Sequence, residues 1–258
     1  MGGRGRWETV SGWFVFALAL FTWEVVGRIF PTLYFPPFSR VLKGLWTTML
    51  STEVVLGHLV PSLRRMAIGY LIAVFLGVSV GGLLGSRQFL FRIVEPVLEF
   101  LRAIPPPVLI PFALLLLGLG DPGKIMVITF GSLWPILLNT IDGTRNVSET
   151  FKDTARLFGR NRAEIAWQVV VPAALPQVFS GMRTSVSIAL IMIVVSEMIA
   201  SSDGLGYYVL RAQRMFDIPV VYSGIFLLGL MGYALNTLFV RLEDFILGWH
   251  RGYTAKTI

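Results

Sequence analysis

Long apolar runs recur along the chain, and their length is that of a membrane-spanning helix. An α-helix rises about 1.5 Å per residue and a bilayer's hydrocarbon core is about 30 Å thick, so about 20 mostly apolar residues make one crossing. An even number of crossings places both ends of a chain on the same side of the membrane. The pattern predicts six crossings, the third of them broken, at residues 10–29, 66–85, 95–120, 125–141, 184–202 and 218–240.

The broken third crossing contains three consecutive prolines, Pro105, Pro106 and Pro107. Such a run cannot sit within an unbroken helix, because proline lacks the backbone donor and clashes with the preceding turn. Irregular backbone at membrane depth is tolerated where protein or a water-filled cavity satisfies its polar groups. The break is therefore a candidate for the lining of a translocation path, although a break near the membrane surface would need no such role.

Glu197 lies near the outer end of the fifth crossing, where an acidic side chain is energetically costly. Such a residue usually faces a cavity or is paired with a base. We therefore predict either a place along the translocation path or a structural ion pair with Arg211 or Arg214 in the following loop.

Two further patterns concern packing. Gly77, Gly81 and Gly85 fall four residues apart on one face of the second crossing, which predicts close approach of another helix. Before that crossing, apolar residues recur at helical spacing after Ser39, the expected N-cap of an amphipathic helix. This helix is expected either to lie along the membrane surface or to pack on protein.

The connection between the fourth and fifth crossings, residues 143–183, is long and polar compared with the other cytoplasmic connections. Ser148 can cap a first short helix and Gly159 can end it. A second helix is predicted from about 162 to 171, ended by Pro172 and Pro176. Two short amphipathic helices with a tight corner would form a rigid knob that fits a groove on a partner.

Composition agrees with a membrane protein: 55% of the residues are hydrophobic, 14% are charged, and mean hydropathy is +0.71. The formal net charge of +7 is explained by basic residues kept in cytoplasmic loops rather than by nucleic-acid binding. Lys and Arg are more frequent in the connections assigned to the cytoplasm, which agrees with cytoplasmic termini. There is no cysteine and the two histidines are far apart, so we expect neither a metal site nor enzyme chemistry.

The polar connection resembles the coupling loop of the permease subunits of binding-protein-dependent ABC importers. That loop reads Glu-Ala-Ala, three residues, Gly, nine residues, Ile, one residue, Leu-Pro, and the spacing here is unbroken. Asp replaces Glu, valines replace Ile and Leu, and Thr154 in place of Ala is the largest departure. The resemblance implies that the matched segment contacts an ATPase through Asp153, Thr154, Ala155, Arg156, Gly159, Val169, Val171 and Pro172.

Further motifs are similar to the branch that imports nitrate, bicarbonate, taurine and alkanesulfonates. The similarity extends over roughly residues 35–252. The motifs are Ser62–Arg65, Ala103–Pro105 with Pro111, Gly118–Gly120, Ser196–Met198, Gly204–Tyr207 and Trp249–Gly252.

The resemblance implies an all-α integral membrane protein with the type I ABC importer permease fold, six transmembrane helices and a cytoplasmic coupling helix. We expect one permease domain over residues 1–258, with the family core at about 60–245. The implied system lies in a bacterial inner membrane, with both termini cytoplasmic, and combines a second, identical permease copy, two ATPase subunits that bind ATP and Mg²⁺, and an extracytoplasmic binding protein. No cofactor is expected on this chain. The alternative, an autonomous secondary transporter or channel, would need ion-coupling carboxylates within the membrane, for which Glu24 and Glu197 are the candidates.

Overall fold

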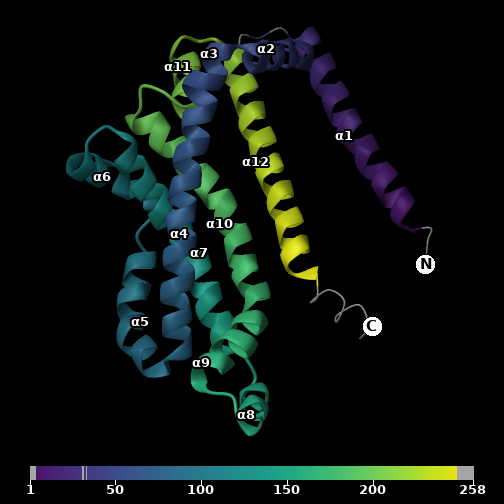
Figure 1. Ribbon diagram of the computed structural model, residues 1–258. Helices are drawn as coiled ribbons and strands as arrows, with labels where there is room; N and C mark the ends of the chain where they lie inside the picture. The colour runs from purple at the N-terminus through teal and green to yellow at the C-terminus, as the bar shows by residue number, and fades with distance from the viewer. Residues whose placement is uncertain (1–3, 31, 33, 249–258) are drawn as a thin grey trace.

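The computed structural model describes residues 4–30, 32 and 34–248, and these are almost entirely helical (Figure 1). The described ranges contain no strand, only an isolated bridge between Thr32 and Phe35. The motif predicted at 249–252 lies outside the described residues. The longest elements are α1 (Arg4–Ile29), α4 (Val60–Ser86), α7 (Asp121–Arg145), α10 (Val171–Ala200) and α12 (Ile218–Ile246).

Four continuous helical stretches are long and apolar enough to cross a membrane: Thr52–Ser86, Asp121–Arg145, Arg162–Ala200 and Ile218–Ile246. A fifth passage is the pair formed by α5 (Gln88–Arg102) and the segment Pro106–Leu117, bent by 73° at the predicted proline break. The predicted first crossing lies on α1, which is not among these candidate spans and stands apart from the other long helices in Figure 1. A sixth crossing therefore stays a prediction.

The direction of each helix follows from its contacts. We call the place where α4 and α7 both begin the α11 end, after the short helix α11 (Leu205–Arg214) that lies there. The place where they finish is the α8 end, after the short helix α8 (Glu149–Leu157) (Figure 1). The segment from α5 to α6 (Leu109–Leu117) returns the chain to the α11 end, and α10 runs antiparallel to α7. The start of α1 and the finish of α12 both point toward the α8 end.

The close approach predicted for Gly77, Gly81 and Gly85 is confirmed, and the neighbour is α7. A Cβ atom on Gly77 would lie 2.7 Å from Cγ2 of Ile136, and one on Gly81 would lie 2.9 Å from the carbonyl oxygen of Leu137. Both distances are too short for a real side chain. The two parallel helices therefore pack backbone against backbone, which replaces the hydrophobic driving force that lipid removes.

The core lies where α4, α7 and α10 meet. Ile128, Ala189 and Ile193 are fully buried within one apolar cluster. Ser185 of α10 donates a hydrogen bond to the carbonyl oxygen of Ser132 on α7, at 2.6 Å. Buried serines of this kind join neighbouring helices because their hydroxyls find partners where water is absent.

The amphipathic helix predicted after Ser39 is α2 (Phe38–Leu50), but the predicted cap is wrong. Ser39 lies inside the helix, and its backbone N–H and hydroxyl both donate to Glu24 at the end of α1, at 2.8 and 2.9 Å. Val41 is buried and its carbonyl accepts a hydrogen bond from Ser223 of α12 at 3.1 Å, whereas Trp46 is exposed. The helix therefore packs on protein with one face, as one prediction stated, and leaves apolar side chains outward; its placement along the membrane surface stays a prediction.

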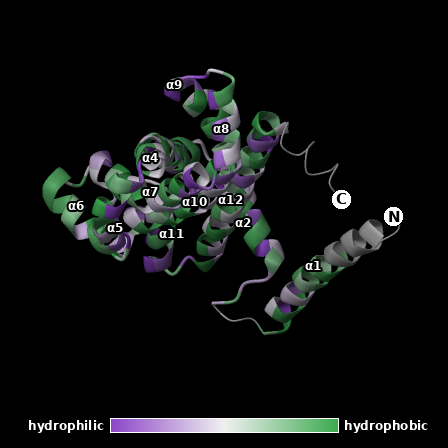
Figure 2. Cartoon of the chain, turned by 90° about the horizontal axis from the view of Figure 1, so that it is seen from below, coloured by the Kyte–Doolittle hydropathy of each residue, from purple (hydrophilic) through white to green (hydrophobic). Residues whose placement is uncertain are grey.

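Hydrophobic residues dominate the long helices, whereas hydrophilic residues lie on several short helices, among them α8 (Glu149–Leu157) and α9 (Arg162–Ile165) (Figure 2). In Figure 1, α8 projects beyond the ends of the long helices. The structure thus separates an apolar bundle from a polar projection at one end.

The tight α4–α7 contact predicts a large difference between neighbouring glycines. Gly81→Ala places a Cβ 2.8 Å from Cβ of Thr140, whereas nothing lies within 4 Å of a Cβ on Gly82. We expect Gly81→Ala to destabilise the protein by about 1–3 kcal/mol, because the helices must separate, and Gly82→Ala to leave it unchanged. Thermal unfolding of the two variants in detergent measures the difference, and equal stability would contradict the packing described here.

Candidate functional site

The projecting corner is built as its sequence predicts. The Ser148 hydroxyl caps α8 by accepting the backbone N–H of Thr150 at 3.3 Å. Gly159 has φ +75°, and the N–H of Arg160 donates to the carbonyl oxygen of Ala155 at 3.1 Å, which closes the end of the helix. This is the glycine-dependent C-terminal motif in which only a residue without a Cβ adopts the left-handed backbone at little cost.

The predicted second helix, from about 162 to a stop at Pro172 and Pro176, is wrong at its end. The chain is continuously helical for 39 residues, from Arg162 to Ala200. A π-helical turn at Ala166–Val170 precedes α10, so Pro172 falls in the first turn of a new α-helical stretch, where a missing N–H is tolerated. The polar connection is therefore confined to the corner around α8 and α9.

The predicted coupling residues divide between the corner and this long helix. Asp153 forms an ion pair with Arg156 at 2.5 Å, and both side chains are exposed, while the Thr154 hydroxyl bonds back to the helix. Val169 and Pro172 lie further along, on the helix that leads into the bundle. The match therefore links an exposed corner with the beginning of a membrane passage.

Exposed apolar side chains cover the tip of the corner. Leu157 is 88% exposed and Phe158 is 81% exposed, and Phe151 and Trp167 are exposed beside them. None of these four was predicted as a site residue, although large apolar residues within a polar connection were a signal that could have identified them. Large apolar groups left in water at the end of a polar projection are typical of a surface that a partner covers.

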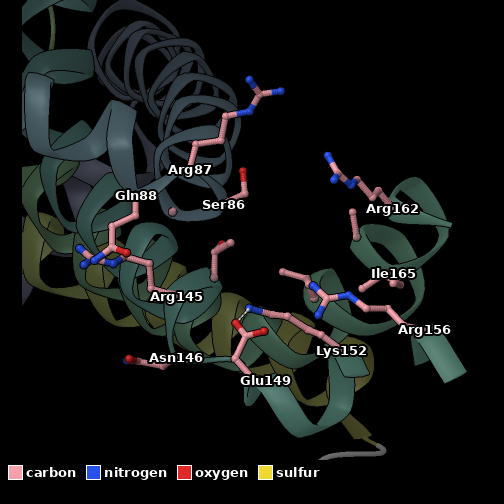
Figure 3. A pocket seen from close by; sticks show the side chains of 14 residues that line it. Ser86, Arg87, Gln88, Arg145, Asn146, Glu149, Lys152, Arg156, Arg162 and Ile165 are labelled. Atoms are coloured by element: carbon pink, nitrogen blue, oxygen red, sulfur yellow. Dashed lines mark hydrogen bonds and ion pairs between the residues drawn. The ribbon is translucent and has the colours of Figure 1, made fainter. Parts of the chain in front are cut away.

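A cleft of about 1000 Å³ lies between this corner and the turn that joins α4 to α5 (Figure 3). In Figure 3 the guanidinium groups of Arg156 and Arg162 extend over the cleft, and Lys152 forms an ion pair with Glu149 at 2.9 Å. Arg145 lies over the ring of Phe91 at 4.5 Å. Basic side chains outnumber the single acidic one in the lining, so this surface suits an acidic partner.

A second cluster of charged side chains lies at the opposite, α11 end, around Arg65. Its guanidinium binds Asp121 at 2.6 Å, Asp203 at 2.8 Å and Glu197 at 3.0 Å. The Arg65 side chain is 4% exposed and that of Glu197 is 0% exposed. Neighbouring Arg64 also binds Asp121 but is 61% exposed.

Glu197 forms an ion pair, as one of the two predictions stated, but its partner is Arg65 rather than Arg211 or Arg214 in the following loop. Its carboxylate also accepts hydrogen bonds from the Ser62 hydroxyl at 2.8 Å and from the Gly206 backbone N–H at 3.1 Å. Gly204 has φ +97°, and a Cβ there would lie 2.2 Å from the carboxylate. The backbone therefore closes around the acid, and the prediction that Glu197 lines a path stays a prediction.

Lys124 completes this cluster. It is buried, donates to the Ser201 hydroxyl at 2.8 Å and lies 3.9 Å from Asp203. Burial by itself raises the pKa of Asp203, but hydrogen bonds from Arg65 and Ser201 outweigh it and hold that pKa below its ordinary value. No group of three or more acids or histidines suited to a metal ion occurs in the described part of the chain.

Four of the motifs quoted for the importer branch meet at this cluster. Arg65 comes from the first, Glu197 from the fourth and Gly204 from the fifth. Gly120, from the third, is the N-cap of α7 next to Asp121. The sequence indicated each motif separately but gave no signal that they converge.

The proline break lies beside the middle of α7. A Cβ on Gly131, near the middle of the 25-residue α7, would lie 3.4 Å from Cβ of Pro106. Pro106 and Pro107 are half-buried and Pro105 is exposed. The backbone therefore leaves helical geometry at the level of the centre of the bundle.

The buried cluster predicts unequal effects for two adjacent arginines. Arg65→Met leaves the buried Glu197 carboxylate without its cation and is expected to cost about 3–5 kcal/mol of stability. Arg64→Met, which loses an exposed pair, is expected to cost at most about 1 kcal/mol. Unfolding in detergent provides the measurement, with Arg65→Met plus Glu197→Gln recovering part of the loss. Similar stabilities for the two single variants would refute this account.

Comparison with known proteins gives consistent matches. The chain is 31% identical over 255 residues to the aliphatic sulfonates transport permease SsuC named in Bacillus subtilis (strain 168), covering 97% of this chain and 91% of that protein. It is 30% identical over 228 residues to the nitrate import permease protein NrtB of Synechococcus elongatus, covering 84% and 82%. A structure of the MetNI methionine ABC transporter in inward-facing conformations matches with a TM-score of 0.62 at 20% identity, covering 73% of this chain and 94% of that one.

The solved structure establishes the fold as that of a type I ABC importer permease. Residues 69–247 match the family described as "Binding-protein-dependent transport system inner membrane component". Permeases of this family are multi-pass membrane components without catalytic activity, and their partners are a separate ATPase, which hydrolyses ATP, and a substrate-binding protein. This chain belongs to the family of binding-protein-dependent transport system inner membrane components, the permease subunits of ABC importers.

Proposed function

We propose that the chain imports a small anion, such as a sulfonate or nitrate, by alternating access in a pair with a second copy of itself. The named activities of the sulfonate and nitrate permeases support the substrate class. Two ATPase subunits that bind ATP and Mg²⁺ drive the pair, and an extracytoplasmic binding protein delivers the anion. The whole assembly lies in the inner membrane.

The observation that carries this proposal is the continuous helix from Arg162 to Ala200, which joins the two ends of the bundle. It begins next to the exposed corner and reaches Glu197 in the buried cluster. A force applied to the corner by ATPase closure is therefore delivered to the α11 end by one rigid element. Such rigid-body movement is the usual basis of alternating access in importers with separate motors.

The corner at α8 is the proposed ATPase contact, with Asp153, Ala155 and Gly159 among its residues and the apolar tip as its centre. It defines the α8 end as cytoplasmic. Because α1 starts and α12 finishes toward that end, both termini are cytoplasmic in this proposal. The basic cleft beside the corner would then face an acidic part of the same partner.

The proline break is the proposed middle of the path. This proposal is supported by the position of its irregular backbone beside the middle of α7, because a water-filled cavity satisfies polar backbone groups within a membrane. We propose that Glu197 keeps the α11 end closed through its ion pair with Arg65, because its carboxylate is enclosed within the single chain. An autonomous secondary transporter would have no use for exposed apolar groups at a cytoplasmic corner, which favours the ATP-driven function.

Two exposed phenylalanines at the same end of the molecule test the proposal. Phe158 at the tip is 81% exposed, and Phe245 near the end of α12 is 87% exposed. In vesicles that contain the permease, its ATPase and its binding protein, we expect Phe158→Asp to reduce ATPase binding and alkanesulfonate or nitrate uptake at least about tenfold, because a charge replaces the apolar centre of the contact. Phe245→Asp should retain both.

The wild-type chain without the ATPase provides a second control. Transport that continues undiminished in its absence, or full uptake by Phe158→Asp, would refute an ATP-driven mechanism. Permease content and thermal unfolding of each variant exclude a loss of folded protein.

A further inference from the structure

A stripe of polar residues runs along the whole of α5. Its members recur every three or four residues, so they share one face of the helix. They are exposed in the single chain, whereas the opposite face packs in an apolar cluster with Trp134 and Leu137 of α7. The stripe consists of Gln88, Arg92, Glu95, Glu99 and Arg102.

The Arg102 end of this stripe lies deep within the proposed membrane passage. Leu101 packs in the cluster that contains Trp134, a residue near the middle of α7. Pro106, four residues after Arg102, lies at the level of Gly131. Arg102 is therefore near mid-depth, far from the polar ends of the bundle.

Lipid cannot be the surroundings of this face. Charged side chains at the centre of a bilayer are costly and face a partner or a water-filled cavity. The Arg102 side chain is 46% exposed and that of Glu99 is 52% exposed, so the chain itself does not enclose them. An aqueous path at this face satisfies both groups and reaches the proline break, whose backbone needs the same surroundings.

We infer that Arg102 is the group in the path that contacts the transported anion, an inference that rests on the proposed function. Its Nε and Nη2 donate to Glu99 at 2.9 and 2.6 Å, which fixes the guanidinium at the end of α5. The remaining N–H groups are free to bind the oxygens of a sulfonate or nitrate, and a planar guanidinium matches such oxyanions.

Glu99 then sets how strongly the anion is held. A carboxylate beside the guanidinium competes with the anion and weakens its binding, which allows release on the cytoplasmic side. Loss of that carboxylate should strengthen anion binding and slow its departure. The pair therefore provides a contact strong enough to select an anion and weak enough to pass it on.

The test uses the complete transporter, with ATPase and binding protein, in vesicles supplied with an alkanesulfonate or nitrate. We expect Arg102→Gln to raise the KM for uptake or lower its rate at least about tenfold, while ATPase stimulation by the loaded binding protein is retained. Arg102→Lys should restore part of the uptake. Arg241→Gln, at an exposed arginine of α12, is the matched control and should behave as wild type. Glu99→Gln should lower both KM and maximal rate.

Uptake by Arg102→Gln at the wild-type KM and rate would overturn the inference and leave the proposed function intact. Equal loss of uptake and of ATPase stimulation would also overturn it, because that result indicates a structural role. If the wild-type complex imports a neutral solute and no anion, both the substrate class proposed above and this inference fail.

Discussion

One buried guanidinium holds the α11 end of the molecule together. Arg65 on α4 binds carboxylates from the start of α7, the end of α10 and the loop before α11 (Leu205–Arg214). A charge removed from water is tolerated only when its partners satisfy it completely, so each of these segments must occupy its place for the others to be stable. The arrangement of the helices at this end consequently depends on the ion pairs of Arg65.

In the proposed mechanism, the long helix acts on these ion pairs. Ion pairs between separate elements have two clear states, formed and broken, whereas packed apolar contacts deform with difficulty. The helix from Arg162 to Ala200 carries Glu197 at one end and adjoins the exposed corner at the other. In the proposed mechanism, a displacement of the corner would change the distance between Glu197 and Arg65 through this one helix.

Local features of the sequence predicted the local structure well. Apolar run length located the second to sixth crossings, and Ser148 and Gly159 correctly placed the limits of α8, because each signal depends on near neighbours. The helix end predicted at Pro172 was wrong because a π-helical turn, for which the sequence gives no signal, lets the helix continue. The cap predicted at Ser39 was wrong because Ser39 donates its hydrogen bonds to Glu24, 15 residues earlier.

The buried charged cluster around Arg65 could not be predicted from local sequence signals. Arg65 and Glu197 are 132 residues apart, and many acids and bases in the chain could have paired equally well by charge alone. The packing of α4 and α10 against α7 brings these two side chains together, and the glycine ridge permits the close approach of α4 to α7. The convergence of the motifs is thus a consequence of backbone geometry.

The same energetics support the proposed pairing of this chain with a second permease copy. The charged face of α5 can rest neither in lipid nor against its own bundle, and it needs water enclosed by further protein. A second permease copy placed opposite this face would enclose that water and convert an energetic cost into a conduction path. Assembly and function would then depend on one requirement, because the surface that destabilises the isolated chain in the bilayer is the surface that contacts the transported anion.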